Sequence, residues 1–484
     1  MAGQNFLAKE EKIEKQKIRI LFINPPWFEG STFDELITKA PPLGLAYLAA
    51  VLEQDGFSHI RIIDMKVGEM DFNGIKEEIE KFKPDIIGLT LATGQVSSTV
   101  KIIRIAKEIN SSTYCIIGGP HVSALPARTL EETGADMAVF GEGELTMLEI
   151  ARAIASGKEL DGIEGLVFKK KDLIKKNLPR PLIKDINTLP FPARHLLPTP
   201  EEYSKDSVIA LSKIETVIMA SRGCPFRCAF CDKSVFGRTL RVRNAKNVVD
   251  EIELLVKQYN VKSLRFFDDL LTAIPERVKE ICHELKKRNL KIKWICEARV
   301  NTVNPEMLAI MKDAGCVEIH YGIESGNQAV LKLQQKDVTL EEIRKAVKWT
   351  NEAGIESRGY FIIGLPGDTK DTIKETIKFG RSLNLTYAGI FFYIPYPGNF
   401  VREYELEDYG QVLARSWDEY AAFEKPIFIP KGMTEKELIK YYRRAYLLMH
   451  LNIKSIINIL KGIKNLTILK SYIKAFFWSA GFKK

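Results

Sequence analysis

Apolar positions in the first third of the chain alternate between short continuous runs and longer stretches with helical spacing. The first run, Ile18–Asn24, ends at two prolines, and Leu43–Gln54 then repeats apolar residues at helical spacing before Gly56. Short apolar runs predict buried strands, and the amphipathic stretches between them predict helices. The alternation predicts an α/β fold with a parallel sheet covered on both faces, of the doubly wound, flavodoxin-like kind. Further strands are expected at Ile60–Asp64, Asp85–Leu91, Tyr114–Gly118 and Met137–Phe140.

Prolines interrupt this pattern after residue 156, and the alternation resumes near Glu215. The intervening residues read as a Pro-rich connector with one short hairpin, and the pattern beyond residue 400 is helical. The expected parts are an extension over 1–17, a sheet domain over 18–156, a linker over 157–215, a second α/β domain over 216–400 and a helical region over 401–484. Strands of the second domain are expected at Thr216–Ala220, Ser263–Phe267, Lys291–Ala298, Glu318–Ile323, Ser357–Ile363 and Ala388–Tyr393.

Charge is concentrated at the carboxyl end. The formal net charge is +9, and residues 451–484 carry seven lysines and no acidic residue. This segment is either a helix packed on the second domain or a basic amphipathic helix lying on an anionic membrane, which would suit a lipid-like substrate. It has no apolar run long enough to span a bilayer. The absence of an apolar leader favours the cytoplasm, and we find no nucleic-acid recognition motif.

Three cysteines follow the first strand of the second domain. Cys224, Cys228 and Cys231 have C-x3-C-x2-C spacing, and thiolates this close in sequence can converge on one metal centre. A zinc site would normally recruit a fourth ligand at short spacing, but the nearest histidines are His195 and His283. A disulfide is disfavoured in a long chain without a secretory signal. An iron–sulfur cluster with one open iron is the favoured interpretation.

This motif, with Phe230 before its last cysteine, resembles the signature of the radical S-adenosylmethionine (SAM) superfamily. The resemblance implies a partial (β/α)6 barrel and a [4Fe-4S] cluster whose fourth iron is chelated by the amino and carboxylate groups of SAM. It also implies an external electron donor of the flavodoxin or ferredoxin type and cleavage of SAM to a 5'-deoxyadenosyl radical. Chemistry in parallel barrels lies at the carboxyl ends of the strands.

Several strand ends match positions that contact SAM in this superfamily. Asp268 and Asp269 match the contact to the amino group, although Asp269 is also placed to cap the next helix. Arg299 matches a recurrent basic position, with an ordinary ion pair as the alternative, and Glu324 of the Gly-Ile-Glu-Ser-Gly segment matches a ligand of the ribose or the amino-acid end. Gly364 and Pro397 lie in segments that resemble the adenine side of the site, and Phe230 belongs to the cluster loop.

The remaining cysteines read mainly as small buried apolar residues. They are Cys115, Cys282, Cys296 and Cys316. Cys296 lies near a strand end, and a role as a hydrogen-atom donor is the alternative kept open for it.

The loops of the first domain resemble the cobalamin-binding domain that precedes many radical SAM domains, over about residues 18–156. The Asp-x-His-x-x-Gly motif, whose histidine ligates cobalt in methionine-synthase-like domains, is absent after the first strand. His121 is a poor candidate for that ligand, and a local cap or turn role is expected for it. The candidate cobalamin contacts are Asn24, Pro25, Thr90, Gly118, Gly119, Gly141 and Glu142.

Together the two resemblances imply a cobalamin-dependent radical SAM enzyme that methylates an unactivated carbon of a small-molecule or lipid-like substrate. An enzyme with the same cofactors that catalyses cyclisation, oxidation or rearrangement is the first alternative. A non-catalytic cobalamin sensor or carrier is an alternative of another class, and the intact cysteine motif argues against it.

Overall fold

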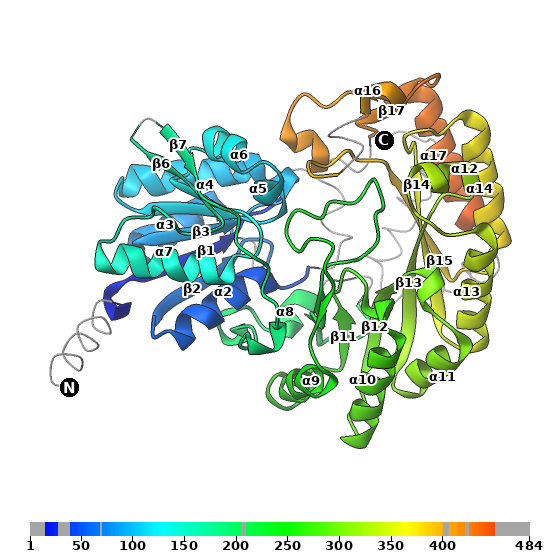
Figure 1. Cartoon of the computed structure of the whole chain (residues 1–484), viewed down its shortest axis with the longest axis horizontal. Coiled ribbons are helices and arrows are strands. Elements are labelled where there is room, and N and C mark those ends of the chain that lie inside the picture. Colours follow the sequence, from blue (N-terminus) through cyan, green and yellow to red (C-terminus); the bar gives the residue numbers. More distant parts are fainter. Residues whose placement is uncertain are drawn as a thin grey trace. The chain divides into compact units, whose positions relative to one another are not determined.

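Two units make up the chain in the computed structural model, which describes residues 15–27, 39–67, 70–171, 173–205, 207, 210–399, 406–421 and 425–450 (Figure 1). The first unit contains residues 1–205 together with Asp232–Gly237 and Ser416–Ala421, and the second contains the rest. The basic tail expected over 451–484 and residues 1–14 of the extension expected over 1–17 lie outside the described residues. None of the helices in the described part of the chain combines the length and the apolar character needed to cross a bilayer.

The first unit is built on a seven-stranded sheet in the order β2-β1-β3-β4-β5-β6-β7. The pairs among β1 to β5 are parallel, as the strand–helix alternation predicts. The strands are β1 (Arg19–Asn24), β2 (His59–Asp64), β3 (Ile86–Thr90), β4 (Tyr114–Gly118), β5 (Met137–Val139), β6 (Leu166–Lys170) and β7 (Leu173–Lys176). The helices are α2 (Leu43–Gln54), α3 (Phe72–Phe82), α4 (Val96–Ile109), α5 (Pro120–Ala124), α6 (Pro126–Thr133), α7 (Glu144–Ser156) and α8 (Pro200–Ser204).

Alternation of side chains along β1 explains why both faces of this sheet are covered. Ile20 and Phe22 pack in one apolar layer with α2 and α7, whereas Leu21 and Ile23 pack in a second layer with α3, α4 and α6. Successive side chains of a strand point to opposite faces, so a strand that is apolar at every position needs two covering layers. The carboxyl ends of β1 to β4 therefore form one accessible edge for ligands.

The sheet continues past residue 156, into the segment expected to be a linker. β6 pairs antiparallel with β5, and β7 pairs antiparallel with β6, so the expected hairpin extends the first sheet. The buried residues Leu166, Val167 and Phe168 explain this extension, because they complete the two apolar layers at the sheet's edge. A run of three apolar residues is too short to reveal its partner from sequence alone.

The second unit contains a six-stranded parallel sheet in the order β15-β14-β13-β12-β11-β8. In Figure 1 the yellow-green and yellow helices of this unit lie on the outer side of that sheet. The strands are β8 (Glu215–Ile218), β11 (Ser263–Phe266), β12 (Lys293–Ala298), β13 (Cys316–Glu324), β14 (Glu356–Ile363) and β15 (Tyr387–Phe392). The helices are α9 (Ala245–Tyr259), α10 (Pro275–Lys287), α11 (Pro305–Asp313), α12 (Gln328–Leu333), α13 (Leu340–Glu352), α14 (Lys370–Ser382), α16 (Leu406–Tyr409) and α17 (Glu435–His450).

Two short antiparallel pairs complete the second unit. One pair, β9 (Ser221–Arg222) with β10 (Arg241–Val242), brackets the cysteine loop, and β16 (Gly410–Val412) pairs with β17 (Phe428–Pro430). The outward residues of the large sheet, such as Ile319 and Phe361, belong to one apolar core beneath the helices. The doubly wound sheet followed by this open parallel barrel confirms the predicted fold class.

Candidate functional site

The cysteine loop leaves the sheet of the second unit at the carboxyl end of β8. Gly223 has a φ of +83° directly before the first cysteine, a conformation that favours glycine. Cys224 is buried, Cys228 and Cys231 are half-buried, and none of the three is in a disulfide. Among the described residues, no three His, Cys, Asp or Glu side chains converge closely enough to hold a metal ion. The loop thus gathers three thiols on one short segment without drawing them to ligating distance.

Backbone contacts fix both ends of this loop. The Gly223 amide donates to Oδ2 of Asp269 at 3.0 Å, and the Ala229 amide donates to the Gln334 carbonyl at 2.9 Å. The Cys231 amide donates to the Cys228 carbonyl at 3.2 Å, which closes a turn over the last two cysteines. Strand ends and the α12 turn therefore position the thiols, as expected for parallel strands with functional loops at their carboxyl ends.

Arg299 follows β12 directly, and its guanidinium lies beside the cysteine loop. Its Nη1 lies 3.4 Å from Sγ of Cys228, and its guanidinium lies 3.8 Å from the centre of the Phe226 ring. Nε donates to Asn301, whereas Nη2 is buried and has no hydrogen-bond partner among the described residues. The described contacts of Arg299 therefore do not include the ordinary ion pair that was the alternative for this residue. A buried donor without an acceptor beside three thiols fits an iron–sulfur cluster, whose sulfurs accept hydrogen bonds.

The two adjacent aspartates after β11 have different surroundings. Asp268 is buried, and its carboxylate accepts from the Ala220 amide at 3.1 Å and from the Ser221 hydroxyl. Burial raises the pKa of Asp268 to about 6, against the opposing effects of Ser221 and Arg277. Asp269 is exposed and holds the Gly223 amide. Both side chains thus support the start of the cysteine loop, and their contact with SAM stays a prediction.

Glu324 ends β13 in a conformation unusual for a residue with a side chain. Its φ is +64°, and such strain persists where the surroundings enforce it, often at functional sites. Oε1 pairs with Nζ of Lys336 at 2.8 Å, and both side chains are nearly buried. The Lys336 ammonium also lies 5.7 Å from the centre of the Phe230 ring, so Glu324 connects to the cysteine loop. A side chain at Gly322 would meet Lys336 Nζ at 2.9 Å, which explains the glycine there.

The other predicted SAM contacts lie at the ends of the last two strands. Gly364 has a φ of +83°, and Oδ2 of Asp368 accepts from the amides of Gly364 and Leu365 at 3.0 Å each. Burial raises the pKa of Asp368 to about 6 despite these hydrogen bonds. Pro397 is buried in the segment after β15, where Asn399 Nδ2 donates to the Tyr396 carbonyl at 2.8 Å.

Cys296 lies on the wrong face of the sheet for a hydrogen donor. It is 1% exposed and belongs to the apolar core between the sheet and the helices, in register with Phe266 and Ile319. Its neighbour Cys316 and burial raise the pKa of the Cys296 thiol well above its ordinary value. The burial of Cys296 therefore favours the main interpretation, a small packed side chain, over the hydrogen-donor alternative.

In the first unit, the predicted contacts at the ends of β1 and β2 form a buried hydrogen-bonded group. Asn24 Nδ2 donates to Oδ1 of Asp64 at 2.9 Å, and Gln95 Nε2 donates to Oδ1 of Asn24 and to the Pro25 carbonyl. The Tyr203 hydroxyl donates to the other oxygen of Asp64 at 3.0 Å. Burial raises the pKa of Asp64. Sequence reasoning found Asn24 and Pro25 but missed Asp64, Gln95 and Tyr203, because their partners are distant in sequence.

Glycines keep the rest of this edge free of side chains. Gly119 has a φ of +114°, and an added Cβ would meet the Leu91 backbone at 2.9 Å. Nothing lies within 4 Å of an added Cβ at Gly141, whose amide donates to Ser123. Glu142 is buried and accepts from the Ile183 amide at 2.8 Å. Thr90 and Gly118 end two neighbouring strands that pair at these positions. A bare sheet edge of this kind fits the close approach of a broad, flat ligand such as a corrin ring.

The segment Ser416–Ala421 also belongs to this first unit, which the sequence did not reveal. Its indole at Trp417 lies edge-on to His121, with ring centres 4.7 Å apart, and Nε1 donates to Glu132 at 2.7 Å. His121 is buried, and its Nδ1 lies 3.1 Å from the Thr93 hydroxyl. These described partners of His121 are distant in sequence, whereas the expectation was a local cap or turn role.

Two family models match the chain. The model described as the radical SAM superfamily matches residues 218–380, and the model described as the B12 binding domain matches residues 34–151. A protein of Pyrococcus horikoshii named "uncharacterized methyltransferase PH0819" is 35% identical over 442 residues, which cover 91% of this chain and 94% of that protein. An anaerobic magnesium-protoporphyrin IX monomethyl ester cyclase of Rubrivivax gelatinosus is 30% identical, covering 89% and 78% respectively.

A solved structure has the same fold. It is the methyltransferase TsrM of Kitasatospora setae, described as radical S-adenosylmethionine-dependent and as bound to cobalamin and a [4Fe-4S] cluster. The TM-score is 0.70 at 18% identity, and the match covers 89% of this chain and 88% of that one.

Proposed function

The chain belongs to the radical SAM enzymes that carry a B12-binding domain, and from this premise we propose that it methylates an unactivated carbon of a small-molecule substrate. The observation that carries the proposal is the 35% identity to a named methyltransferase over 94% of that protein's length. A match of this extent includes the cysteine loop and the glycine-lined sheet edge, so both cofactor regions lie within it.

The cofactors of this enzyme are a [4Fe-4S] cluster, SAM and cobalamin. When bound, they supply an electron, a radical that removes a hydrogen atom, and a methyl group for the substrate carbon. The protein contributes binding, orientation and charge around them. We assign the cluster to Cys224, Cys228 and Cys231, which stand together on the loop after β8.

Arg299 has a distinct role beside these thiols. Its guanidinium already donates to one thiol and retains a second buried donor, Nη2. A fixed cation lowers the energy of thiolates and of negatively charged sulfur, so Arg299 favours the loaded loop. Its stacking on Phe226 keeps the guanidinium in place while the loop accommodates the cluster.

Glu324 and Asp269 are the acceptors assigned to SAM. The Lys336 ammonium stabilises the Glu324 carboxylate in a buried position, so this group remains available as a hydrogen-bond acceptor. Asp269 is exposed at the same carboxyl edge and carries the charge that suits an ammonium group. We assign the backbone of Gly364 and Pro397 to the adenine side of SAM and Phe230 to the wall of the cysteine loop. Asp268 stabilises the start of that loop through Ala220 and Ser221.

Cobalamin is assigned to the edge of the first unit. Asn24, Pro25 and Thr90 end its central strands; Gly141 has open space beside its backbone, whereas Gly118 and Gly119 pack closely against neighbouring backbone at the same edge. Glu142 holds the amide of Ile183 and so fixes the loop after β5. The Asp-x-His-x-x-Gly motif, which supplies a histidine in methionine-synthase-like domains, is missing after the first strand.

A second candidate function keeps the same cofactors without methyl transfer. The 30% identity to an anaerobic cyclase, over 78% of that protein's length, favours cyclisation or oxidation of the substrate. The two candidates differ in one observable feature, which is whether the SAM methyl group remains in the product.

A deletion strain distinguishes them. We expect a strain that lacks the gene, fed methyl-labelled methionine, to lose one labelled small molecule or lipid that the parent contains. Complementation with Cys224→Ala should fail to restore it, whereas Cys282→Ala, which removes a buried cysteine of α10, should restore it. An unlabelled compound that disappears in the same way would instead support cyclisation or oxidation.

We also propose a cytoplasmic enzyme that is reduced by a flavodoxin- or ferredoxin-type protein. Peripheral membrane contact through residues 451–484 is proposed from their seven lysines and their apolar periodicity. Co-sedimentation with anionic liposomes, with and without these residues, tests this contact, and equal binding would remove it.

A further inference from the structure

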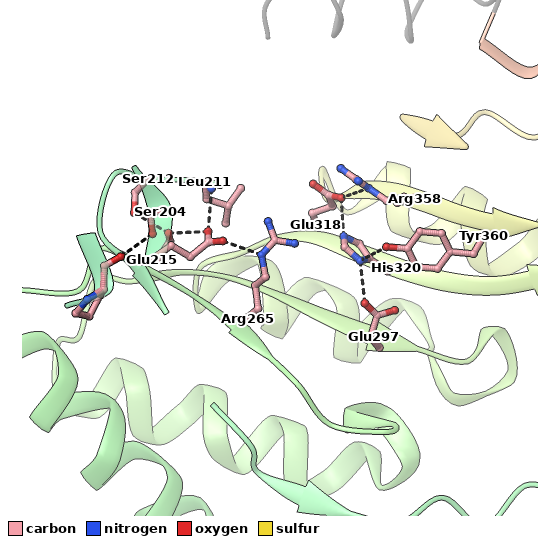
Figure 2. A network of polar contacts seen from close by, with 12 residues as sticks. Ser204, Leu211, Ser212, Glu215, Arg265, Glu297, Glu318, His320, Arg358 and Tyr360 are labelled. Atoms are coloured by element: carbon pink, nitrogen blue, oxygen red, sulfur yellow. Dashed lines mark hydrogen bonds and ion pairs between the residues drawn. The ribbon is translucent and has the colours of Figure 1, made fainter. Parts of the chain in front are cut away.

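A chain of polar side chains crosses the sheet of the second unit below the strand ends (Figure 2). His320 of β13 lies between two carboxylates, with Nδ1 2.9 Å from Glu297 and Nε2 2.7 Å from Glu318. The Tyr360 hydroxyl lies 2.9 Å from the same Nδ1, and Arg358 donates to Glu318 at 2.6 Å. None of these residues belongs to the cofactor regions.

Strand alternation places this group on the inner face of the open barrel. Ile319 and Tyr321 of β13 pack in the core beneath the helices, so Glu318 and His320 point the other way. Figure 2 shows Glu318, His320 and Arg358 on the side of the sheet that is turned away from the helices. Burying ionisable groups there is costly unless they are paired, and these groups are paired.

The two carboxylates determine the protonation of His320. Neutral imidazole has one N–H and one lone pair, so it would present a lone pair to one carboxylate. The imidazolium donates to both, and we assign this form from its partners. Burial opposes the charged ring, but the hydrogen bonds to Glu297 and Glu318 outweigh it and raise the pKa of His320. Burial also opposes the Glu318 carboxylate, but Arg358 and His320 hold its pKa at about 2.

This protonation state leaves two groups directed away from the network. With Nδ1–H on the imidazolium, Glu297 and the Tyr360 oxygen share this one proton as acceptors, and the Tyr360 O–H can donate elsewhere. The Glu297 side chain is 44% exposed, and its Oε2 has no hydrogen-bond partner among the described residues. One donor and one acceptor thus stand side by side on the inner face.

The formal charges of the six ionised side chains in this polar chain cancel. Glu215 pairs with Arg265 at 2.7 Å on the neighbouring strands, and Arg265 also lowers the pKa of Glu318 through its charge. The three carboxylates Glu215, Glu297 and Glu318 are thus matched by Arg265, Arg358 and the imidazolium. A cancelled charge favours an uncharged polar partner over an ammonium or a phosphate.

An exposed aromatic side chain, Phe391, lies next to Tyr360. Phe391 of β15 is 43% exposed and meets the Tyr360 ring edge-on, with ring centres 5.7 Å apart. An added Cβ at Gly389 would meet the Tyr360 ring at 2.5 Å, so glycine makes room for this pair. An exposed large aromatic beside two convergent polar groups is the usual composition of a small-molecule site.

We propose that Glu297 and Tyr360, held by His320, bind an uncharged donor–acceptor group of the substrate, such as an amide or a hydroxyl beside a carbonyl. The proposal rests on the proposed function and specifies the substrate class. Phe391 covers the apolar part next to that group. Glu297 pairs in register with His320 and Tyr360 with Gly322, four and two residues before Glu324 on β13, so the two anchor residues lie roughly 13 Å and 7 Å below the predicted SAM ligand. The substrate is therefore an elongated molecule with an uncharged polar end and a reacting carbon on the order of 10 Å away.

The test uses anaerobically reconstituted, full-length enzyme and a small-molecule extract of the deletion strain as the probe. Tyr360→Phe removes one hydroxyl, and Glu297→Gln removes the charge while keeping the shape. Tyr387→Phe is the matched control, because Tyr387 is a tyrosine of the same sheet face that lies next to Arg358 but outside this group. We expect the amount of extract that gives half-maximal product to rise about ten-fold in Tyr360→Phe and more in Glu297→Gln.

Two further readouts separate binding from a structural role. Formation of 5'-deoxyadenosine without extract should stay within about two-fold of wild type in the control variant Tyr387→Phe. The extract should raise the melting temperature of the wild-type protein and of Tyr387→Phe, but not of Tyr360→Phe. A half-saturating amount of extract that is unchanged in Tyr360→Phe and Glu297→Gln would overturn the inference, whatever their melting temperatures.

The failure of the inference differs from that of the proposed function. If extract stimulates 5'-deoxyadenosine formation but no SAM methyl enters a product, methyl transfer fails, and the variants still report on binding through that stimulation. If the methyl enters a product equally well in wild type and both variants, only the binding site fails. A pH series adds a check on His320. The amount of extract that gives half-maximal product should increase as the pH rises through the raised pKa of His320. The reason is that the Tyr360 hydroxyl then donates its proton to the neutral ring and no longer to the substrate.

Discussion

Glu324, a predicted SAM ligand of the second unit, combines a strained backbone with a buried charge. Glu324 adopts a left-handed backbone conformation, which costs about 1–3 kcal/mol for a residue with a side chain. Its carboxylate is nearly buried and relies on Lys336. Both features are maintained only because the surrounding sheet enforces them, so this pair is a sensitive point for substitution.

Lys336→Met tests that dependence. The substitution keeps the volume of the side chain but leaves Glu324 as a buried carboxylate without its cation. We expect a loss of about 3–5 kcal/mol in the free energy of unfolding of the apoprotein, measured by urea denaturation. Lys345→Met is the control, since Lys345 is exposed and lies 3.7 Å from Glu341. Equal effects of the two substitutions would contradict the account of the buried pair.

Gly119→Ala tests the bare edge of the first unit. Gly119 and Gly56 both have φ near +100°, so alanine carries a similar backbone penalty at each. An added Cβ meets the Leu91 backbone at Gly119 but meets nothing within 4 Å at Gly56. We therefore expect Gly119→Ala to destabilise by about 1–3 kcal/mol more than Gly56→Ala and to retain less cobalamin after gel filtration. The same cobalamin content in both would argue against this edge as the binding site.

At the scale of elements, the turn after β14 depends on a buried carboxyl group. Asp368 accepts from two backbone amides of the turn and from the Thr372 hydroxyl at 2.7 Å. Burial nevertheless raises its pKa from 3.8 to about 6. The folded protein therefore binds this proton more tightly than the unfolded chain does, and the stability that comes from it decreases as the pH rises from about 4 to 6.

Asp368→Asn removes this titration with little change of shape. The amide oxygen can still accept from the turn, and the amide nitrogen can donate to Thr372. The free energy of unfolding of the variant relative to wild type should increase between pH 4 and 6 and level off above, by a difference of at most about 3 kcal/mol. Asp371→Asn, at an exposed position nearby, should show no such increase. A flat difference for Asp368→Asn would contradict the raised pKa.

Most elements could be predicted from the sequence because their strands are buried on both faces or alternate regularly. Leu43–Gln54 and Tyr114–Gly118 were predicted with the bounds observed. The inner residues Glu318, His320 and Glu324 also follow a period of two, a signal that identifies one face of β13. Their partners Glu297 and Tyr360 come from other strands, and pairing across strands depends on a register that sequence does not reveal.

At the scale of the whole molecule, two short segments join the first unit from distant parts of the chain. They are Asp232–Gly237, which follows the cysteine loop, and Ser416–Ala421, which lies in the region expected to be helical. Trp417 packs on His121 through contacts that carry no local sequence signal. The cysteine motif and the glycine loops, by contrast, are local patterns, and both led to the correct family.

The central claim is that one chain uses both cofactor domains to move a methyl group from SAM to carbon. The most direct measurement incubates the anaerobically reconstituted enzyme with trideuteromethyl SAM, a reductant and the small-molecule extract of the deletion strain. We expect a product that carries the intact trideuterated methyl group, formed together with 5'-deoxyadenosine. A product that depends on the enzyme and on SAM cleavage but contains no deuterium would contradict it.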